Sequence, residues 1–352
     1  MLILLYALTL GAGGELQGND TKLSRFEAAE IHMGVDFTIV LYAENEDAAQ
    51  RGFKAAFARI EQLNGIMSDY DPESELSRLS DAAPTEKPVS LSDDLYAVLK
   101  ESLRWSRASD GAFDVTVGPM VRLWRRARRQ QEMPSSERLA EARAAVGYQH
   151  VRPDAGHKTA MLAKSNVRLD LGGIAKGYAV DEALKTLRSL GIRRALVNGS
   201  GDVGAGDPPP DESGWKIGIA PLEADGPPSR ILLLANRAVA TSGDAFQYVE
   251  IGGMRYSHIV DPRTGLGLTD HSSVSVVADD CTTADALASA VSVLGPDKGL
   301  ALVERTTRAA ALILRAPHGK PETHVSKTFD ELPTAKKNTS GSRLDARQDK
   351  NG

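Results

Sequence analysis

Cysteine is nearly absent from this sequence: Cys281 is the single one among 352 residues. A lone thiol excludes an intramolecular disulfide framework and a zinc site made of several cysteines, and we expect Cys281 to fill space in the core. The seven histidines form no His-Glu-x-x-His pair, and no serine lies in a Gly-x-Ser-x-Gly elbow. The common zinc-peptidase and serine-hydrolase motifs are therefore missing.

An excess of positive charge is also missing. The net charge is −5 and the pI is about 5.9, which argues against a nucleic-acid-binding protein. The one basic run, Arg122 with Arg125, Arg126, Arg128 and Arg129, is short, and we interpret it as the solvated face of a helix. Hydrophobic residues make up 41% of the chain, so a sizeable core is expected. The length fits two domains or one large domain.

The N-terminal residues 1–10 form an apolar run that is too short to span a bilayer. Its length fits the hydrophobic part of a secretory signal, and the Gly-Ala-Gly-Gly that follows would supply a cleavage site. The run has no preceding Lys or Arg, and no cysteine follows that would carry a lipid. We predict that residues 1–22 direct export to the periplasm or cell envelope, although the signal is atypical.

Helical and strand patterns mix irregularly along the rest of the chain. Apolar residues three or four apart predict helices, for example over residues 45–67 and 282–294. Alternation predicts strands, for example over residues 36–43 and 194–198, and a hairpin over 247–259. No βαβ period repeats, so the pattern favours an α+β fold.

These patterns extend over one continuous stretch. We predict a single large domain of mixed sheets flanked by helices over residues 23–316. Residues 317–352 are polar and aperiodic, and we predict that they form a disordered tail.

The stretch Leu169–Asp181, LDLGGIAKGYAVD, combines an acid, a Gly-Gly turn, a lysine and the start of an amphipathic helix. We predict a strand over 167–171 that leads into the turn. Backbone N–H groups and the helix dipole at such a junction attract anionic oxygens. The motif is neither the phosphate loop of NTPases nor Gly-x-Gly-x-x-Gly. Taken alone, it is equally well explained as an ordinary strand–turn–helix junction.

A second polar cluster lies in the predicted helix CTTADALASAVSVL, over residues 281–294. Asp285 and Ser289 are four residues apart, so their oxygens lie on one helix face. A carboxylate and a hydroxyl are hard donors that suit Mg²⁺ and are poor for zinc. An acid in a first helical turn is also ordinary helix chemistry, and this alternative remains open.

A third candidate is His258, which ends a predicted strand before the turn Asp261–Gly265. A histidine at that place would serve as a general base, because its free pKa lies near neutral pH. A histidine bonded to a turn carbonyl would look the same in the sequence.

Together these motifs carry a family resemblance. LDLGGIAKGYAVD, ATSGD, SHIVDPRTG and TTADALASAVSVLG follow DYDPESELSRLS and GAFDVTVGP along the chain. On the basis of these six motifs, the sequence resembles the FAD:protein FMN transferases of the ApbE family, from about Met33 to Leu314. Six motifs over most of the chain make the resemblance specific.

The resemblance implies a Mg²⁺-dependent enzyme that cleaves FAD and attaches FMN through a phosphoester bond to a Thr or Ser hydroxyl of a target protein, releasing AMP. It implies FAD as substrate, and as partner an acceptor protein such as a subunit of a redox complex. Asp285, Ser289 and the carbonyl of Gly173 match the family's metal ligands, and His258 matches its base. The positions that match its FAD contacts are Met33, Tyr70, Ala112, Phe113, Asp114, Asp170, Lys176 and Ile259.

Two departures from the family pattern matter. Ser289 stands where the family usually has threonine, and it keeps the oxygen donor but lacks the methyl that restricts the rotamer. The lipidated cysteine common near family N-termini is absent, so peripheral membrane association is an open question. Two other functions use the same motifs: a Mg²⁺-dependent FAD pyrophosphatase with water as acceptor, and a flavin-binding protein without turnover.

Overall fold

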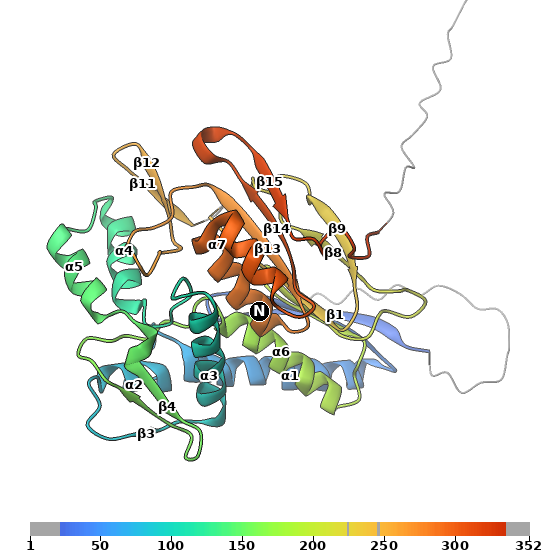
Figure 1. Cartoon of the computed structure of the whole chain (residues 1–352). Helices are drawn as coiled ribbons and strands as arrows, with labels where there is room; N and C mark the ends of the chain where they lie inside the picture. The colour runs from blue at the N-terminus through green and yellow to red at the C-terminus, as the bar shows by residue number, and fades with distance from the viewer. Residues whose placement is uncertain (1–21, 224, 245–246, 336–352) are drawn as a thin grey trace, which may run out of the picture.

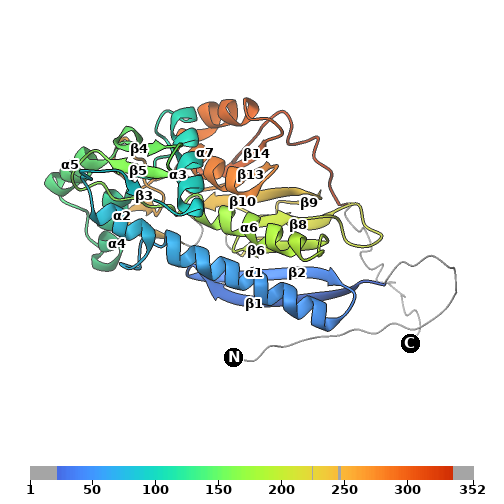
Figure 2. The ribbon, with the colours of Figure 1, turned by 90° about the horizontal axis from the view of Figure 1, so that it is seen from below.

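The computed structural model describes residues 22–223, 225–244 and 247–335. The predicted export segment, apart from Lys22, lies outside these residues, as do residues 336–352 of the predicted tail. The described part of the chain has the predicted α+β architecture, built around one large sheet (Figures 1 and 2).

The main sheet is antiparallel throughout and runs in the order β1-β2-β6-β7-β10-β13-β14-β15. Its strands are β1 (Ser24–His32), β2 (Val35–Ala43), β6 (Ala195–Gly199), β7 (Asp202–Ala205), β10 (Arg237–Gly243), β13 (Ser272–Ala278), β14 (Ala310–Arg315) and β15 (Glu322–Val325). The strand patterns over 36–43 and 194–198 are thereby confirmed to within a residue or so at their ends. Successive strand residues face opposite sides of the sheet, so both faces contribute to the core.

Smaller sheets and single-turn helices connect these strands. The small strands are β3 (Val89–Ser90), β4 (Val151–Asp154) and β5 (Thr159–Leu162), the pair β8 (Trp215–Ile219) and β9 (Arg230–Leu234), and the predicted hairpin β11 (Tyr248–Ile251) with β12 (Met254–Ser257). The 3₁₀ turns are η1 (Tyr148–His150) and η2 (Pro317–Gly319).

Helices cover one face of the main sheet. The helices are α1 (Glu46–Met67), α2 (Glu75–Asp81), α3 (Asp93–Ala108), α4 (Gly118–Gln130), α5 (Ser136–Ala145), α6 (Ala175–Ser189) and α7 (Cys281–Glu304). Helices α1, α6 and α7 lie side by side on this face, whereas α2, α4 and α5 gather at one end of the molecule (Figures 1 and 2). Phe37, Ile39 and Leu41 of β2 point into this helical layer.

The opposite face of the sheet is covered by the β8–β9 pair and by the segment after β15. Val40 of β2 and Leu312 of β14 pack there with Leu232, Phe329 and Leu332. Phe329 is only 1% exposed. The predicted tail is therefore wrong for residues 317–335: β15 pairs with β14, and the following segment closes the second half of the core. The folded domain extends beyond residue 316 by that segment.

One other prediction needs correction. Residues 167–171 form no regular strand; Arg168 makes one bridge to Val117, and the Asp170 N–H donates to the Val115 carbonyl. The segment pairs only with an irregular neighbour, so it does not join a sheet. The motif DYDPESELSRLS contains α2, which begins because the Ser74 side chain accepts a bond from the Ser77 N–H.

Helix α7 is the core element that carries the predicted metal ligands. Among the described helices it alone is long and apolar enough to cross a membrane by composition. Its Cys281, Leu287 and Val291 are buried in the main core, which accounts for that apolarity. Gly295 has φ 74° and interrupts the helix directly after the helical pattern predicted over residues 282–294.

The segment after β15 provides a stability test. Replacing the buried Phe329 by alanine leaves a cavity between β14 and the β8–β9 pair, so we expect Phe329→Ala to cost about 3–5 kcal/mol in the free energy of unfolding. Urea denaturation measures this value. Glu331→Ala is the matched control, because Glu331 is exposed in the same segment. Equal stability of the two variants would contradict the assigned packing.

Candidate functional site

The first turn of α6 lies directly against α7. A Cβ added to Gly177 would be 2.4 Å from the Cys281 carbonyl oxygen and 2.9 Å from Asp285 Cβ. A Cβ added to Gly173 would be 2.7 Å from Ser289 Oγ. Only glycine permits these approaches. They bring Gly173 to Ser289 and Gly177 to Asp285, the two predicted metal-binding side chains.

Asp285 is buried at this contact. Its Oδ2 accepts a hydrogen bond of 3.1 Å from the Gly177 N–H, and the side chain is 5% exposed. Burial is the largest influence on this group and the neighbouring Asp202 adds to it, so the pKa of Asp285 is raised to about 7, although Lys176 acts in the opposite direction. A buried carboxyl group with a raised pKa binds a cation favourably, because the cation replaces the proton that otherwise neutralises the carboxylate.

No residue that the structure describes donates a hydrogen bond to Ser289 Oγ or to Asp285 Oδ1. Ser289 Oγ, Asp285 Oδ1 and the Gly173 carbonyl oxygen thus accept no hydrogen bond from the described residues at the α6–α7 contact. The described residues contain no group of three or more His, Cys, Asp or Glu side chains placed to hold a metal. A metal here would thus have one carboxylate, a hydroxyl and a carbonyl as its protein ligands.

Lys176 binds a residue that the sequence analysis did not select. Its ammonium forms an ion pair with Asp202, which is 1% exposed at the start of β7. Burial alone would lower the pKa of Lys176, but Asp202 and Asp285 outweigh it and raise the pKa. Lys176 therefore stays charged between two buried acids, beside the predicted metal ligands. Asp202 is the last residue of the Gly-rich sequence NGSGD, residues 198–202. This motif is the sequence feature that could have indicated Asp202 as a site residue.

A second cluster joins Asp170 to Tyr70 through Arg125 of α4. The guanidinium group lies 4.0 Å from the centre of the Tyr70 ring, and it bonds Asp69 at 2.5 Å and Asp170 at 3.3 Å. Asp170 also accepts a 2.8 Å bond from the Gly172 N–H. The interpretation of Arg125 as part of a solvated face is therefore wrong: its side chain is 19% exposed. Arg122, Arg126 and Arg129 are exposed as expected.

The segment Ala112–Asp114 is buried between these clusters. The Asp114 carboxylate accepts bonds from the N–H and hydroxyl of Thr116 and from the N–H of Tyr148, at 2.7–2.8 Å. Its side chain holds the loop together, while the ring of Phe113 lies beside Gly173. Burial raises the pKa of Asp114 despite those bonds.

His258 follows β12, and a backbone carbonyl fixes its ring. Both its N–H and its Nδ1 bond the Gln247 carbonyl oxygen, at 3.0 and 3.1 Å. Nδ1 therefore carries the proton and Nε2 is left as the basic nitrogen. Next to it, the Ile259 N–H bonds Ser257 Oγ at 3.1 Å.

Burial lowers the pKa of His258 below 6.5. Arg128 and Lys176 lower it further, whereas the Gln247 carbonyl and Asp244 act to raise it. The ring is thus kept as a neutral base. The influence of Lys176 also shows that the His258 ring and the α6–α7 contact lie within electrostatic range of each other.

The structure brings most of the predicted residues together, in linked groups. Gly173, Phe113, Asp285 and Ser289 lie at the α6–α7 contact. Tyr70 and Asp170 are linked through Arg125, which contacts both. Met33 lies in the β1–β2 turn with φ 51° and packs against the main core; no described contact joins it to the other predicted positions. The roles of all these residues in binding stay predictions.

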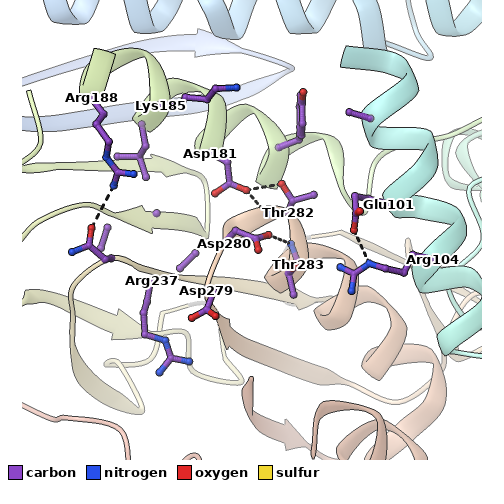
Figure 3. Close-up of a pocket in the computed structure, with 17 residues that line it drawn as sticks. Glu101, Arg104, Asp181, Lys185, Arg188, Arg237, Asp279, Asp280, Thr282 and Thr283 are labelled. Atoms are coloured by element: carbon purple, nitrogen blue, oxygen red, sulfur yellow. Dashed lines mark hydrogen bonds and ion pairs between the residues drawn. The ribbon is translucent and has the colours of Figure 1, made fainter. Parts of the chain in front are cut away.

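A separate cleft lies beside α6 and the start of α7. Its volume is about 740 Å³. Asp181, Arg188 and Arg237 are among its lining residues (Figure 3), and none of the predicted site residues lines it. Asp181 accepts bonds from the N–H groups of Cys281 and Thr282 at 2.8 Å and from the Thr282 hydroxyl. Its carboxylate thus caps α7. The cleft is lined by charges of both signs that already serve the fold.

Comparisons with known proteins identify the family of this chain. The ApbE family model matches residues 33–313. The FAD:protein FMN transferase of Haemophilus influenzae is 35% identical over 79% of this chain and 82% of its own length, and that of Vibrio cholerae is 32% identical over 93% and 97%. The apo flavinyl transferase ApbE of Pseudomonas stutzeri superposes with a TM-score of 0.78 at 33% identity, over 89% of this chain and 98% of that one. The chain belongs to the ApbE family.

The helix contact can be tested by adding one methyl group. In Gly177→Ala the new Cβ would overlap the Cys281 carbonyl, so α6 and α7 must separate, and we expect a loss of about 1–3 kcal/mol in the free energy of unfolding. Gly65→Ala in α1 is the matched control, because nothing lies within 4 Å of its added Cβ. A gain of up to about 1 kcal/mol is expected there. Equal thermal unfolding of both variants and wild type would disprove the close contact.

Proposed function

We propose that this chain is a Mg²⁺-dependent FAD:protein FMN transferase with its site at the α6–α7 contact. Flavin transfer is the activity of the family to which the chain belongs. The observation that carries the location is the pairing of buried Asp285 with Ser289 against the Gly173 turn. The reaction cleaves the pyrophosphate of FAD, attaches FMN by a phosphoester bond to a Thr or Ser hydroxyl of an acceptor protein, and releases AMP.

The donor set supports Mg²⁺ in particular. Asp285, Ser289 and the Gly173 carbonyl would supply oxygen ligands only, which is what Mg²⁺ prefers, and few protein ligands leave room for waters and phosphate oxygens. The raised pKa of Asp285 favours binding a cation in place of the proton. When bound, the ion would supply charge neutralisation for the pyrophosphate. Lys176 adds a fixed positive charge beside it.

His258 is the proposed base. Its Nε2 would take the proton of the acceptor hydroxyl while that oxygen attacks the phosphorus on the FMN side of FAD. The bond from that phosphorus to the bridging oxygen breaks, and the bridging oxygen leaves with AMP. This transfer depends on positioning more than on a covalent intermediate. The Gln247 carbonyl, by holding Nδ1–H, keeps Nε2 available.

Tyr70 and Asp170 are proposed to bind the rings or hydroxyls of FAD. Tyr70 is 74% exposed, which leaves aromatic surface open for stacking. The carboxylate of Asp170 would accept hydrogen bonds from the nucleotide. We propose that the backbone at Met33, Ala112 and Ile259 also binds FAD.

Export remains a proposal supported by the apolar residues 1–10. We propose that the protein acts on the periplasmic or envelope side, with peripheral membrane association as a further option. Recovery of the tagged chain in the periplasmic fraction would support this location, and purely cytoplasmic recovery would refute it.

The function is tested by incubating the protein with FAD, Mg²⁺ and a candidate acceptor domain. A mass gain of one FMN on the acceptor, lost when its Thr or Ser is changed to alanine, is expected. Free FMN and AMP without labelling would identify the pyrophosphatase instead. Bound but intact FAD would identify a binding protein.

Asp285→Ala is expected to reduce FMN transfer at least about a hundredfold, because it removes the one carboxylate of the metal site. Mg²⁺ titration of the transfer rate measures the effect. Asp297→Ala, which removes an exposed acid from the second half of α7, is the control and should retain wild-type rates. Near-normal Mg²⁺-dependent activity of Asp285→Ala would remove Asp285 from the metal site.

The lowered pKa of His258 predicts the pH dependence of transfer. A group whose pKa lies below 6.5 stays deprotonated as the pH falls to that value. At saturating Mg²⁺, which would displace the proton of Asp285, the rate should therefore hold down to pH 6.5 and fall only below it. His258→Ala should lower the rate about a hundredfold or more and abolish this acid limb. FAD binding should be retained.

The exposed His157 provides the control, since it lies on the β4–β5 turn with a side chain 81% exposed. His157→Ala should keep both the rate and the pH profile of the wild type. An unchanged acid limb in His258→Ala would assign the titration to another group. Loss of FAD binding would give His258 a structural role instead.

A further inference from the structure

We infer that Arg125 is a positioning residue for FAD, which holds the Tyr70 ring and the Asp170 carboxylate in the arrangement that receives the dinucleotide. This inference rests on the proposed function, since Tyr70 and Asp170 are its proposed FAD contacts. It adds a residue that lies between them and comes from a separate element, α4.

The geometry of the guanidinium group carries the argument. One face of the group lies 4.0 Å from the centre of the Tyr70 ring, whereas its Nη1 bonds Asp69 at 2.5 Å and its Nη2 lies 3.3 Å from Asp170 Oδ2. A planar, delocalised cation meets all three groups at once, and a lysine ammonium would not. Arg125 therefore joins segments about a hundred residues apart in the sequence.

The cation also sets the charge of the site. Asp170 is 8% exposed, and burial and the neighbouring Asp69 both raise its pKa, whereas Arg125 opposes them. Burial would lower the pKa of Arg125 itself, but the two acids raise it. The guanidinium thus stays charged and favours the ionised form of Asp170, which is the form that accepts hydrogen bonds from a ligand.

The exposure of Tyr70 points to a ligand on its other side. Arg125 covers one face of the ring, yet the residue is 74% exposed. A tyrosine fixed by a cation on one face and open on the other presents a preformed stacking surface. The contact with Arg125 restrains the ring but leaves most of its surface open to a ligand. We therefore assign the exposed ring face to an aromatic ring of FAD.

The test compares Arg125→Ala, Arg125→Lys and the control Arg126→Ala. Arg126 is the next residue of α4, is exposed, and bonds only Gln130 among the described residues. The Kd for FAD is measured by quenching of flavin fluorescence without turnover, and KM and kcat are measured in the transfer assay. Circular dichroism and thermal unfolding report whether each variant is folded.

We expect Arg125→Ala to raise the Kd and KM for FAD about tenfold or more, with kcat changed less than about threefold. Arg125→Lys should recover only part of the affinity, because it keeps the charge and loses the planar contact. Arg126→Ala should match the wild type. If Arg125→Ala does not fold, Asp69→Asn loosens the same guanidinium and should raise the Kd in the same direction.

A Kd for FAD within twofold of wild type in folded Arg125→Ala, or in Asp69→Asn where that variant replaces it, would overturn the inference. A lowered melting temperature with unchanged Kd would show that Arg125 serves only the fold. The behaviour of the wild-type protein distinguishes a failure of the proposed function from a failure of the role inferred for Arg125. Wild type that binds FAD and fails to transfer FMN would refute the proposed function, while the ratio of variant to wild-type Kd would still decide the role of Arg125. Wild type that binds no FAD would refute both.

Discussion

The close approach of α6 to α7 is the constraint on which the site depends. Gly173 and Gly177 lack the Cβ atoms that would hold the two elements apart, so Gly173 meets Ser289 and Gly177 meets Asp285 directly. The same contact buries Asp285, and burial is what raises its pKa and makes a bound cation favourable. Asp181, from the next turns of α6, fixes the register by binding the first N–H groups of α7. A structural contact and a chemical site are thus formed by the same residues.

Charge around this contact is arranged in pairs of opposite sign. Lys176 lies between Asp202 and Asp285, and Arg125 lies between Asp69 and Asp170. Buried acids alone would be protonated or destabilising, and the neighbouring cations oppose the rise in the pKa of Asp202, Asp285 and Asp170. In the proposed function, Lys176 would face the pyrophosphate, Asp170 would accept hydrogen bonds from the nucleotide, and the neutral ring of His258 would act as the base for the acceptor hydroxyl.

Much of this arrangement could be predicted from the sequence. Asp285, Ser289 and Gly173 were selected because helix periodicity places the first two on one face and because the motifs resemble one family. The structure confirms that Gly173 and Ser289 meet. Arg125 was misjudged because nothing local distinguishes it from Arg126: its partners come from residues 69–70 and 170, and only tertiary packing brings them to α4. Asp202 was missed for the same reason.

The prediction of the fold from the sequence has the same limit, because elements that depend on tertiary contacts leave no local signal. Long periodic elements such as α1 were predicted to within a residue, since a capping Asn45 and a regular apolar stripe define it locally. Strand β15 spans only Glu322–Val325 and is polar, so its pairing with β14 leaves no periodic signal. Phe329 was isolated in a polar stretch, and its burial depends on the β8–β9 pair a hundred residues earlier.

The central claim is that the α6–α7 contact is the metal and FAD site. A crystal structure with Mn²⁺ in place of Mg²⁺ and with FAD tests it most directly, because anomalous scattering locates the ion. The account predicts an anomalous peak bounded by Asp285, Ser289 and the Gly173 carbonyl, with the pyrophosphate beside it. A peak at another place while FAD is bound, for example in the cleft lined by Asp181 and Arg237, would contradict it.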